Sequence, residues 1–111
     1  KLNINLALET DLPPLHFLNL LHKFDSDVIK VNYDVGNSAS LGFDIVEEFE
    51  LYGNRISDIH IKDRLLGGGS VVLGTGNANF KSFFEVFSNI DSIFFNGKNV
   101  SQAYAPGIRL R

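Results

Sequence analysis

The sequence has no cysteine, no methionine and no excess of basic residues, and none of its apolar runs is long. The absence of cysteine excludes a disulfide framework, a thiolate zinc site and a cysteine nucleophile. A membrane span needs about 20 apolar residues in a row, so we expect no membrane association. Ten Lys and Arg against thirteen Asp and Glu give a formal net charge of -3. Because this balance leaves no surplus of positive charge for phosphates, we expect no nucleic-acid partner.

The remaining composition is that of a small globular domain. The chain has 111 residues, of which 44% are hydrophobic and 21% are charged, and this length allows one domain at most. It begins at Lys1, contains no methionine and enters a strand-like segment at once, so we expect an excerpt of a longer protein. No basic segment with a following apolar stretch opens the chain, and we therefore expect a cytoplasmic location by default.

The periodicity of apolar residues predicts an alternation of strands and helices. Alternating apolar and polar residues indicate strands, and apolar residues at helical spacing indicate amphipathic helices. The expected strands cover residues 2–8, 28–33, 56–62 and 99–104; the expected helices cover 13–23, 43–52 and 80–87, with loops at 38–42 and 67–69. On the second of these helices, Glu47, Glu48 and Glu50 are expected to face solvent.

This order predicts an α/β fold of parallel βα units. Strands that alternate with helices pair in parallel through right-handed crossovers. Four such units amount to half of a (β/α)8 TIM barrel, which takes about 250 residues when complete. A free half-barrel leaves open sheet edges and an uncovered apolar face, so we expect either a homo-oligomer or a missing half-barrel.

Three candidate metal ligands follow the expected parallel strands. Glu9 comes directly after the first strand, Asp34 follows the second, and His60 lies near the end of the third. The carboxyl ends of parallel barrel strands open on one face, where active sites lie, so these side chains are expected to converge. Two carboxylates and an imidazole suit a divalent cation such as Mn²⁺, Mg²⁺, Co²⁺ or Zn²⁺.

Each of these residues alone has a structural explanation as well. An acidic Glu9 favours the N-terminus of the helix that begins near Pro13. Asp34 is suited to hold the following turn through an Asx-type hydrogen bond. A lone His60 on an apolar strand is commonly a core histidine with satisfied hydrogen bonds. The metal interpretation depends on all three occurring at the same end of successive strands.

A glycine-rich segment, GTGNAN at residues 74–79, starts like a dinucleotide-binding fingerprint. The third glycine of that fingerprint is missing, and the segment does not follow the first strand of a βαβ unit. We therefore predict a turn in which Asn77 or Asn79 caps the helix that begins at Phe80.

Four segments together resemble a known family. They are LE at residues 8–9, YDVGN at 33–37, IHIKDR at 59–64 and VLGTG at 72–76. In this order they resemble the xylose isomerase-like barrels, specifically the sugar phosphate isomerase/epimerase group, over about residues 4–104. The superfamily also contains endonuclease IV-type repair enzymes. The resemblance implies the C-terminal half of the barrel, strands five to eight.

The resemblance also implies roles for individual residues. Glu9 resembles a ligand that also acts as an acid/base residue, and Asp34 and His60 resemble further ligands. Gln102 stands where the family usually has a glutamate as fourth ligand and second base, and glutamine cannot take up a proton at neutral pH. The resemblance places four more residues around the substrate: Lys62 in the catalytic set, and Asn37, Asp63 and Arg64 in contact with the sugar or sugar phosphate. Asn37 stands where the family often has a histidine, and the alternative for the charges of residues 62–64 is a solvated ion pair.

The expected function is therefore a divalent-metal-dependent isomerase or epimerase of a sugar, expected to be a sugar phosphate. It would abstract a proton from the carbon beside a metal-polarised carbonyl, with activity expected of the full barrel. Two alternatives stay open. An endonuclease IV-like phosphodiesterase is disfavoured by the shortage of basic residues, whereas a non-catalytic barrel remnant is favoured by Gln102 and the short length. The loop at 67–69 is expected to be either a lid or an ordinary exposed turn.

Overall fold

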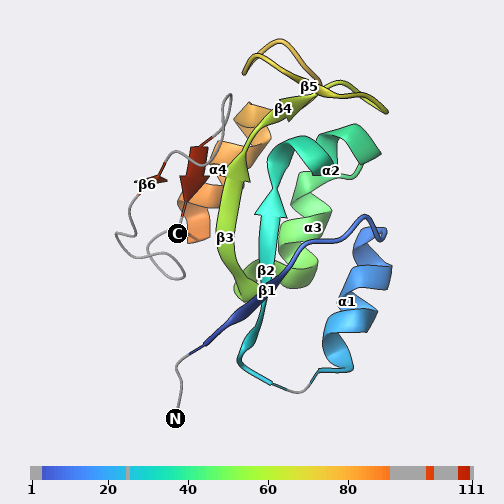
Figure 1. Ribbon diagram of the computed structural model, residues 1–111, viewed down its shortest axis with the longest axis vertical. Helices are drawn as coiled ribbons and strands as arrows, with labels where there is room; N and C mark the ends of the chain where they lie inside the picture. Colours follow the sequence, from blue (N-terminus) through green and yellow to red (C-terminus); the bar gives the residue numbers. More distant parts are fainter. Residues whose placement is uncertain (1–3, 25, 91–99, 102–107, 111) are drawn as a thin grey trace.

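The computed structural model describes residues 4–24, 26–90, 100–101 and 108–110. Its helices and strands are β1 (Leu6–Leu8), α1 (Pro14–His22), β2 (Ile29–Asp34), α2 (Val35–Leu41), α3 (Ile45–Tyr52), the 3-10 turn η1 (Gly53–Arg55), β3 (Ile56–Ile61), β4 (Asp63–Arg64), β5 (Ser70–Val71), α4 (Phe80–Ile90), β6 (Val100–Ser101) and β7 (Ile108–Leu110) (Figure 1).

The main sheet has the strand order β1-β2-β3-β7-β6. Strands β1, β2 and β3 pair in parallel, and α1 connects the first two while α2 and α3 connect the second and third. The expected α/β class and the parallel pairing of the first three strands are confirmed. This part of the sheet positions the candidate site, because the strands end along one edge.

The far side of the sheet differs from the expectation. A fourth parallel strand over residues 99–104 should pair directly with the third, but β7 lies between β3 and β6 and is antiparallel to both. The described part of that segment, Val100–Ser101, runs in the predicted direction but not beside β3. The apolar-polar-apolar pattern of 108–110 is only three residues long, which is too short to distinguish β7 from a loop.

Helix α2 was not expected, because residues 38–42 were expected to form a loop. Asp34 caps α2 by accepting the backbone N–H of Asn37 at 2.9 Å. The helix ends at Gly42, whose φ of 76° is the left-handed conformation that terminates many helices. Strand β5 pairs antiparallel with β4, so the glycine loop at 67–69 is the tip of a hairpin.

The core lies between the parallel strands and helices α1, α3 and α4, which lie behind the strands in Figure 1. Each helix contributes a buried phenylalanine. Two of these rings pack edge to face on a tyrosine, with ring centroids 5.1 Å apart for Phe17 and Tyr52 and 4.9 Å apart for Phe49 and Tyr33. Phe83 is fully buried beside Phe49. Among the described helices, none has both the length and the apolarity that a membrane span requires.

Candidate metal centre

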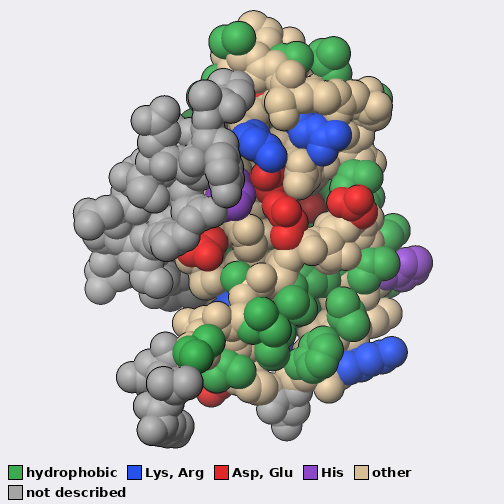
Figure 2. Space-filling model, viewed as in Figure 1, with side chains coloured by type: hydrophobic (Ala, Val, Ile, Leu, Met, Phe, Trp, Pro, Cys, Tyr) green, Lys and Arg blue, Asp and Glu red, His purple; other side chains and the backbone are tan. Residues whose placement is uncertain are grey.

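The structure brings Glu9, Asp34 and His60 together. Each offers one ligand atom, and the three atoms all lie within 4.8 Å of one another. Glu9 follows β1 directly, Asp34 is the last residue of β2, and His60 is its partner in register on β3. The parallel register places these residues at the carboxyl ends of three neighbouring strands. Figure 2 shows acidic side chains beside basic ones and a histidine there.

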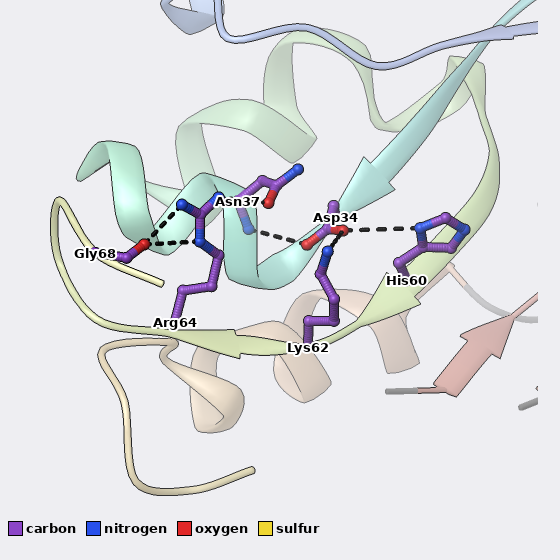
Figure 3. A network of polar contacts seen from close by, with 6 residues as sticks. All are labelled: Asp34, Asn37, His60, Lys62, Arg64 and Gly68. Atoms are coloured by element: carbon purple, nitrogen blue, oxygen red, sulfur yellow. Dashed lines mark hydrogen bonds and ion pairs between the residues drawn. The ribbon is translucent and has the colours of Figure 1, made fainter. Parts of the chain in front are cut away.

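The buried carboxylate of Asp34 is the centre of the cluster, with only 2% of its side chain exposed. Its Oδ1 accepts the capping hydrogen bond from the Asn37 N–H, so the alternative helix-cap role is real. Its Oδ2 faces two groups from β3 and the residue after it: the Lys62 Nζ at 3.1 Å and the His60 Nδ1 at 3.7 Å (Figure 3). The cap fixes the carboxylate so that Oδ2 points into the site.

Lys62 is held in place through its backbone. A Cβ added to Gly36 would lie 2.9 Å from the Lys62 Cβ, closer than real Cβ atoms approach. Glycine at position 36 therefore lets the first turn of α2 pack directly against the residue that follows β3. From this position the lysine side chain extends to Asp34 (Figure 3).

Glu9 lies on the exposed side of the cluster. Partial burial of its carboxyl group raises its pKa, and the nearby charge of Asp34 raises it further. The Lys62 ammonium and the Asn37 side chain act in the opposite direction but do not outweigh these effects. Glu9 does not cap α1, whose N-cap residue Pro13 has no side-chain capping bond.

Asn37 and Arg64 lie beside the cluster and bind each other. The Arg64 Nη1 donates to the Asn37 Oδ1 at 2.8 Å, and its Nε and Nη2 donate to the Gly68 carbonyl at 2.9 and 2.6 Å. The Gly67 N–H also donates to the Ser40 carbonyl at 2.8 Å. These contacts tie the glycine loop to α2, and the guanidinium that was expected to bind substrate is engaged within the protein.

Asp63, which was expected to contact the sugar, is buried and bound to the backbone of the 74–78 segment. Its residue is only 1% exposed, and its carboxylate accepts backbone N–H groups from Gly74, Gly76 and Ala78 at 2.9, 2.8 and 3.0 Å. Burial alone would raise the pKa of this carboxyl, but these donors and the Arg64 N–H outweigh it and lower the pKa. Asp63 is thus the anchor of the 74–78 segment. Gln102, the expected fourth ligand, lies outside the described residues.

A second polar cluster was missed because Glu48 was expected to face solvent. The residue is 3% exposed, and its carboxylate accepts hydrogen bonds from the hydroxyls of Tyr33, Ser38 and Tyr52. Burial raises its pKa although these three hydroxyls act to lower it. The spacing contained the signal, since Glu48 shares one helix face with Ile45 and Tyr52.

A cavity of about 20 Å³ is lined by residues of both polar clusters, among them Glu9, Asp34 and Glu48. This is space for one water molecule and far too little for a sugar. A ligand larger than water finds room beside this cluster only on its solvent side, where Glu9 is exposed.

No known family, curated protein or solved structure matches the chain. What the cluster can do chemically is therefore inferred from the arrangement of its side chains. It unites two carboxylates, an imidazole and an ammonium at one strand edge. Such a set can bind a divalent cation, hold an oxygen-rich ligand and move a proton at the Glu9 carboxylate.

Proposed function

We propose that the chain belongs to a divalent-metal-dependent isomerase or epimerase that acts on a sugar or sugar phosphate. The observation that carries the proposal is the convergence of Glu9, Asp34 and His60 at the carboxyl edge of parallel strands. That edge is where parallel barrels hold their active sites. The family resemblance of the sequence points to the same chemistry.

The donor set fits a hard or borderline divalent cation. Two carboxylates that lie this close repel each other when both are ionised, and a cation between them relieves the repulsion. Carboxylate oxygens and a neutral imidazole are ligands of Mn²⁺, Mg²⁺, Co²⁺ and Zn²⁺. Asp34 supports the assignment further, because its cap orients one oxygen away from the helix and toward His60.

The residues of the chain then have distinct tasks. The cation would supply charge stabilisation for a carbonyl oxygen of the substrate. Asp34 and His60 would hold the cation, and the exposed Glu9 would reach the substrate side. The Glu9 carboxylate takes the proton from the carbon beside the carbonyl, and the C–H electron pair moves into an enediolate. In isomerisation, Glu9 returns the proton to the adjacent carbon while the hydroxyl proton of the first carbon passes to the former carbonyl oxygen. In epimerisation, solvent supplies a proton to the opposite face of the same carbon and Glu9 keeps the one it took.

A half-barrel architecture accounts for the exposed apolar surface along the edge strand β1. Among the described strands β1 pairs with β2 alone, and Ile4 and Leu6 are 60% and 56% exposed. Figure 2 shows hydrophobic side chains clustered below the acidic site on this face. In the proposed architecture, further βα units pair with this edge and cover the patch.

Solvent exchange tests the proposed chemistry without knowledge of the sugar. The full chain with Mn²⁺ is incubated in D2O with a panel of ketoses, aldoses and their phosphates, and deuterium at the carbon beside the carbonyl is measured by NMR. We expect exchange with at least one compound, its loss in Glu9→Gln, and its retention in the control Glu47→Gln on the exposed side of α3. Exchange that is equal in both variants, or absent from the unaltered chain across the panel, contradicts the proposal.

A further inference from the structure

We infer that Lys62 is the resident counter-cation of the metal centre and sets how tightly a divalent ion binds there. The inference rests on the proposed metal site and adds its regulation. The ammonium of Lys62 lies 3.1 Å from the Asp34 Oδ2, while the side chain is 28% exposed. In the absence of a metal ion, this ion pair partly neutralises the two adjacent carboxylates.

The hydrogen bonding of Asp34 makes the competition direct. Its Oδ1 already accepts the capping N–H of Asn37, and its Oδ2 is the oxygen that faces His60. A cation bound between Asp34 and His60 must therefore use the same oxygen as Lys62. Two positive charges on one buried carboxylate oxygen repel strongly, so the ammonium has to withdraw or the ion binds more weakly.

Lys62 has limited freedom to leave this position. Gly36 packs against its Cβ and its carbonyl group, so the backbone at Lys62 is fixed and only the outer side chain can move. Its partial exposure gives the ammonium a route into solvent. The site can therefore exist in two arrangements, one closed by Lys62 and one open to a divalent ion.

Among the described residues, Arg64 and Lys81 are cationic side chains that are engaged elsewhere. The guanidinium of Arg64 is occupied by Asn37 and the Gly68 carbonyl. Lys81 is 88% exposed on α4 and its ammonium lies 3.9 Å from Glu85, so it serves as a matched control. Removing the charge of Lys62 removes the ion pair with Asp34 in the proposed metal centre, whereas removing the charge of Lys81 removes only an exposed ion pair on α4.

Calorimetric titration of Mn²⁺ into the full chain tests the inference. We expect Lys62→Met to bind Mn²⁺ roughly tenfold more tightly than the unaltered chain. Lys62→Arg, which keeps the charge, and Lys81→Met are expected to stay within about threefold of the unaltered chain. Lys62→Gln is a second neutral variant in case Lys62→Met does not fold.

The outcomes separate this inference from the proposed function. Equal or weaker binding by the neutral variants overturns the role of Lys62 while leaving the metal site intact. If neither the unaltered chain nor the neutral variants bind Mn²⁺, the metal centre itself is wrong. Tighter binding by the neutral variants that disappears when His60→Ala is added supports both.

Discussion

Gly76 lies so close to Asp63 that no side chain fits between them. The Gly76 N–H donates to the Asp63 Oδ2 at 2.8 Å, and a Cβ at position 76 would overlap the carboxylate and lie 2.7 Å from the Arg64 carbonyl oxygen. This contact explains the GTGNA segment. Its glycines allow the backbone to wrap around a buried carboxylate, which is a structural task and not the binding of a dinucleotide phosphate.

We expect Gly76→Ala to lower the free energy of unfolding by about 2 kcal/mol, because the methyl group displaces a carboxylate that holds three backbone donors. Chemical denaturation measures the change. The control is Gly69→Ala, where an added Cβ meets nothing within 4 Å and the expected change is within about 0.5 kcal/mol. Similar losses of stability in both variants would show that replacing any loop glycine is costly, and that the contact of Gly76 with Asp63 is not the cause.

The fold was predictable where local periodicity and the sheet agree. The apolar spacing around Phe17 and Phe49 predicted α1 and α3, and the alternation around Ile59 predicted β3. Strand β7 was not predicted, because three residues carry too little periodicity to be distinguished from a loop. Helix α2 was missed because Gly36, Ser38 and Ser40 are weak helix formers, and the Asp34 cap offsets that weakness only in the folded chain.

The candidate site was predictable for a different reason. Glu9, Asp34 and His60 were found because parallel strands bring their carboxyl ends together, so position along the chain is enough to place them. The roles of Asp63 and Arg64 were not predictable in this way. A charged residue after a strand can point to the site or to a neighbouring loop, and only packing against Gly76 and Gly68 decides between them.

Glu48→Gln isolates the pH dependence of the buried cluster. The folded-state pKa of Glu48 is raised above its ordinary value of 4.5, so the folded chain holds this proton more tightly than the unfolded chain does. The resulting stability is present below about pH 4.5 and is lost as the pH rises through the folded-state pKa. We expect the stability of the unaltered chain relative to Glu48→Gln to fall as the pH rises above about 4.5.

Urea denaturation at several pH values measures this difference. Glu47→Gln, an exposed change on the same helix, controls for the loss of a negative charge and is expected to show no such trend. Glu9 also has a raised pKa and adds its own pH dependence to the stability of the unaltered chain. The effect of Glu48 is therefore the difference in stability between the unaltered chain and Glu48→Gln at each pH. A constant difference across this range would mean that Glu48 titrates alike in the folded and unfolded chains.

Asp34→Asn separates the two tasks of this residue, because asparagine caps helices about as well as aspartate but lacks the charge that binds a cation. We expect Mn²⁺ at a hundred times its dissociation constant to stabilise the unaltered chain by about 2.7 kcal/mol and to leave Asp34→Asn unaffected. Thermal unfolding with and without Mn²⁺ gives the comparison. The matched control is Asp44→Asn, since Asp44 caps α3 through the Val46 N–H at 3.1 Å and belongs to no metal cluster among the described residues. If Mn²⁺ stabilises Asp34→Asn as much as Asp44→Asn, the buried carboxylate acts only as a helix cap.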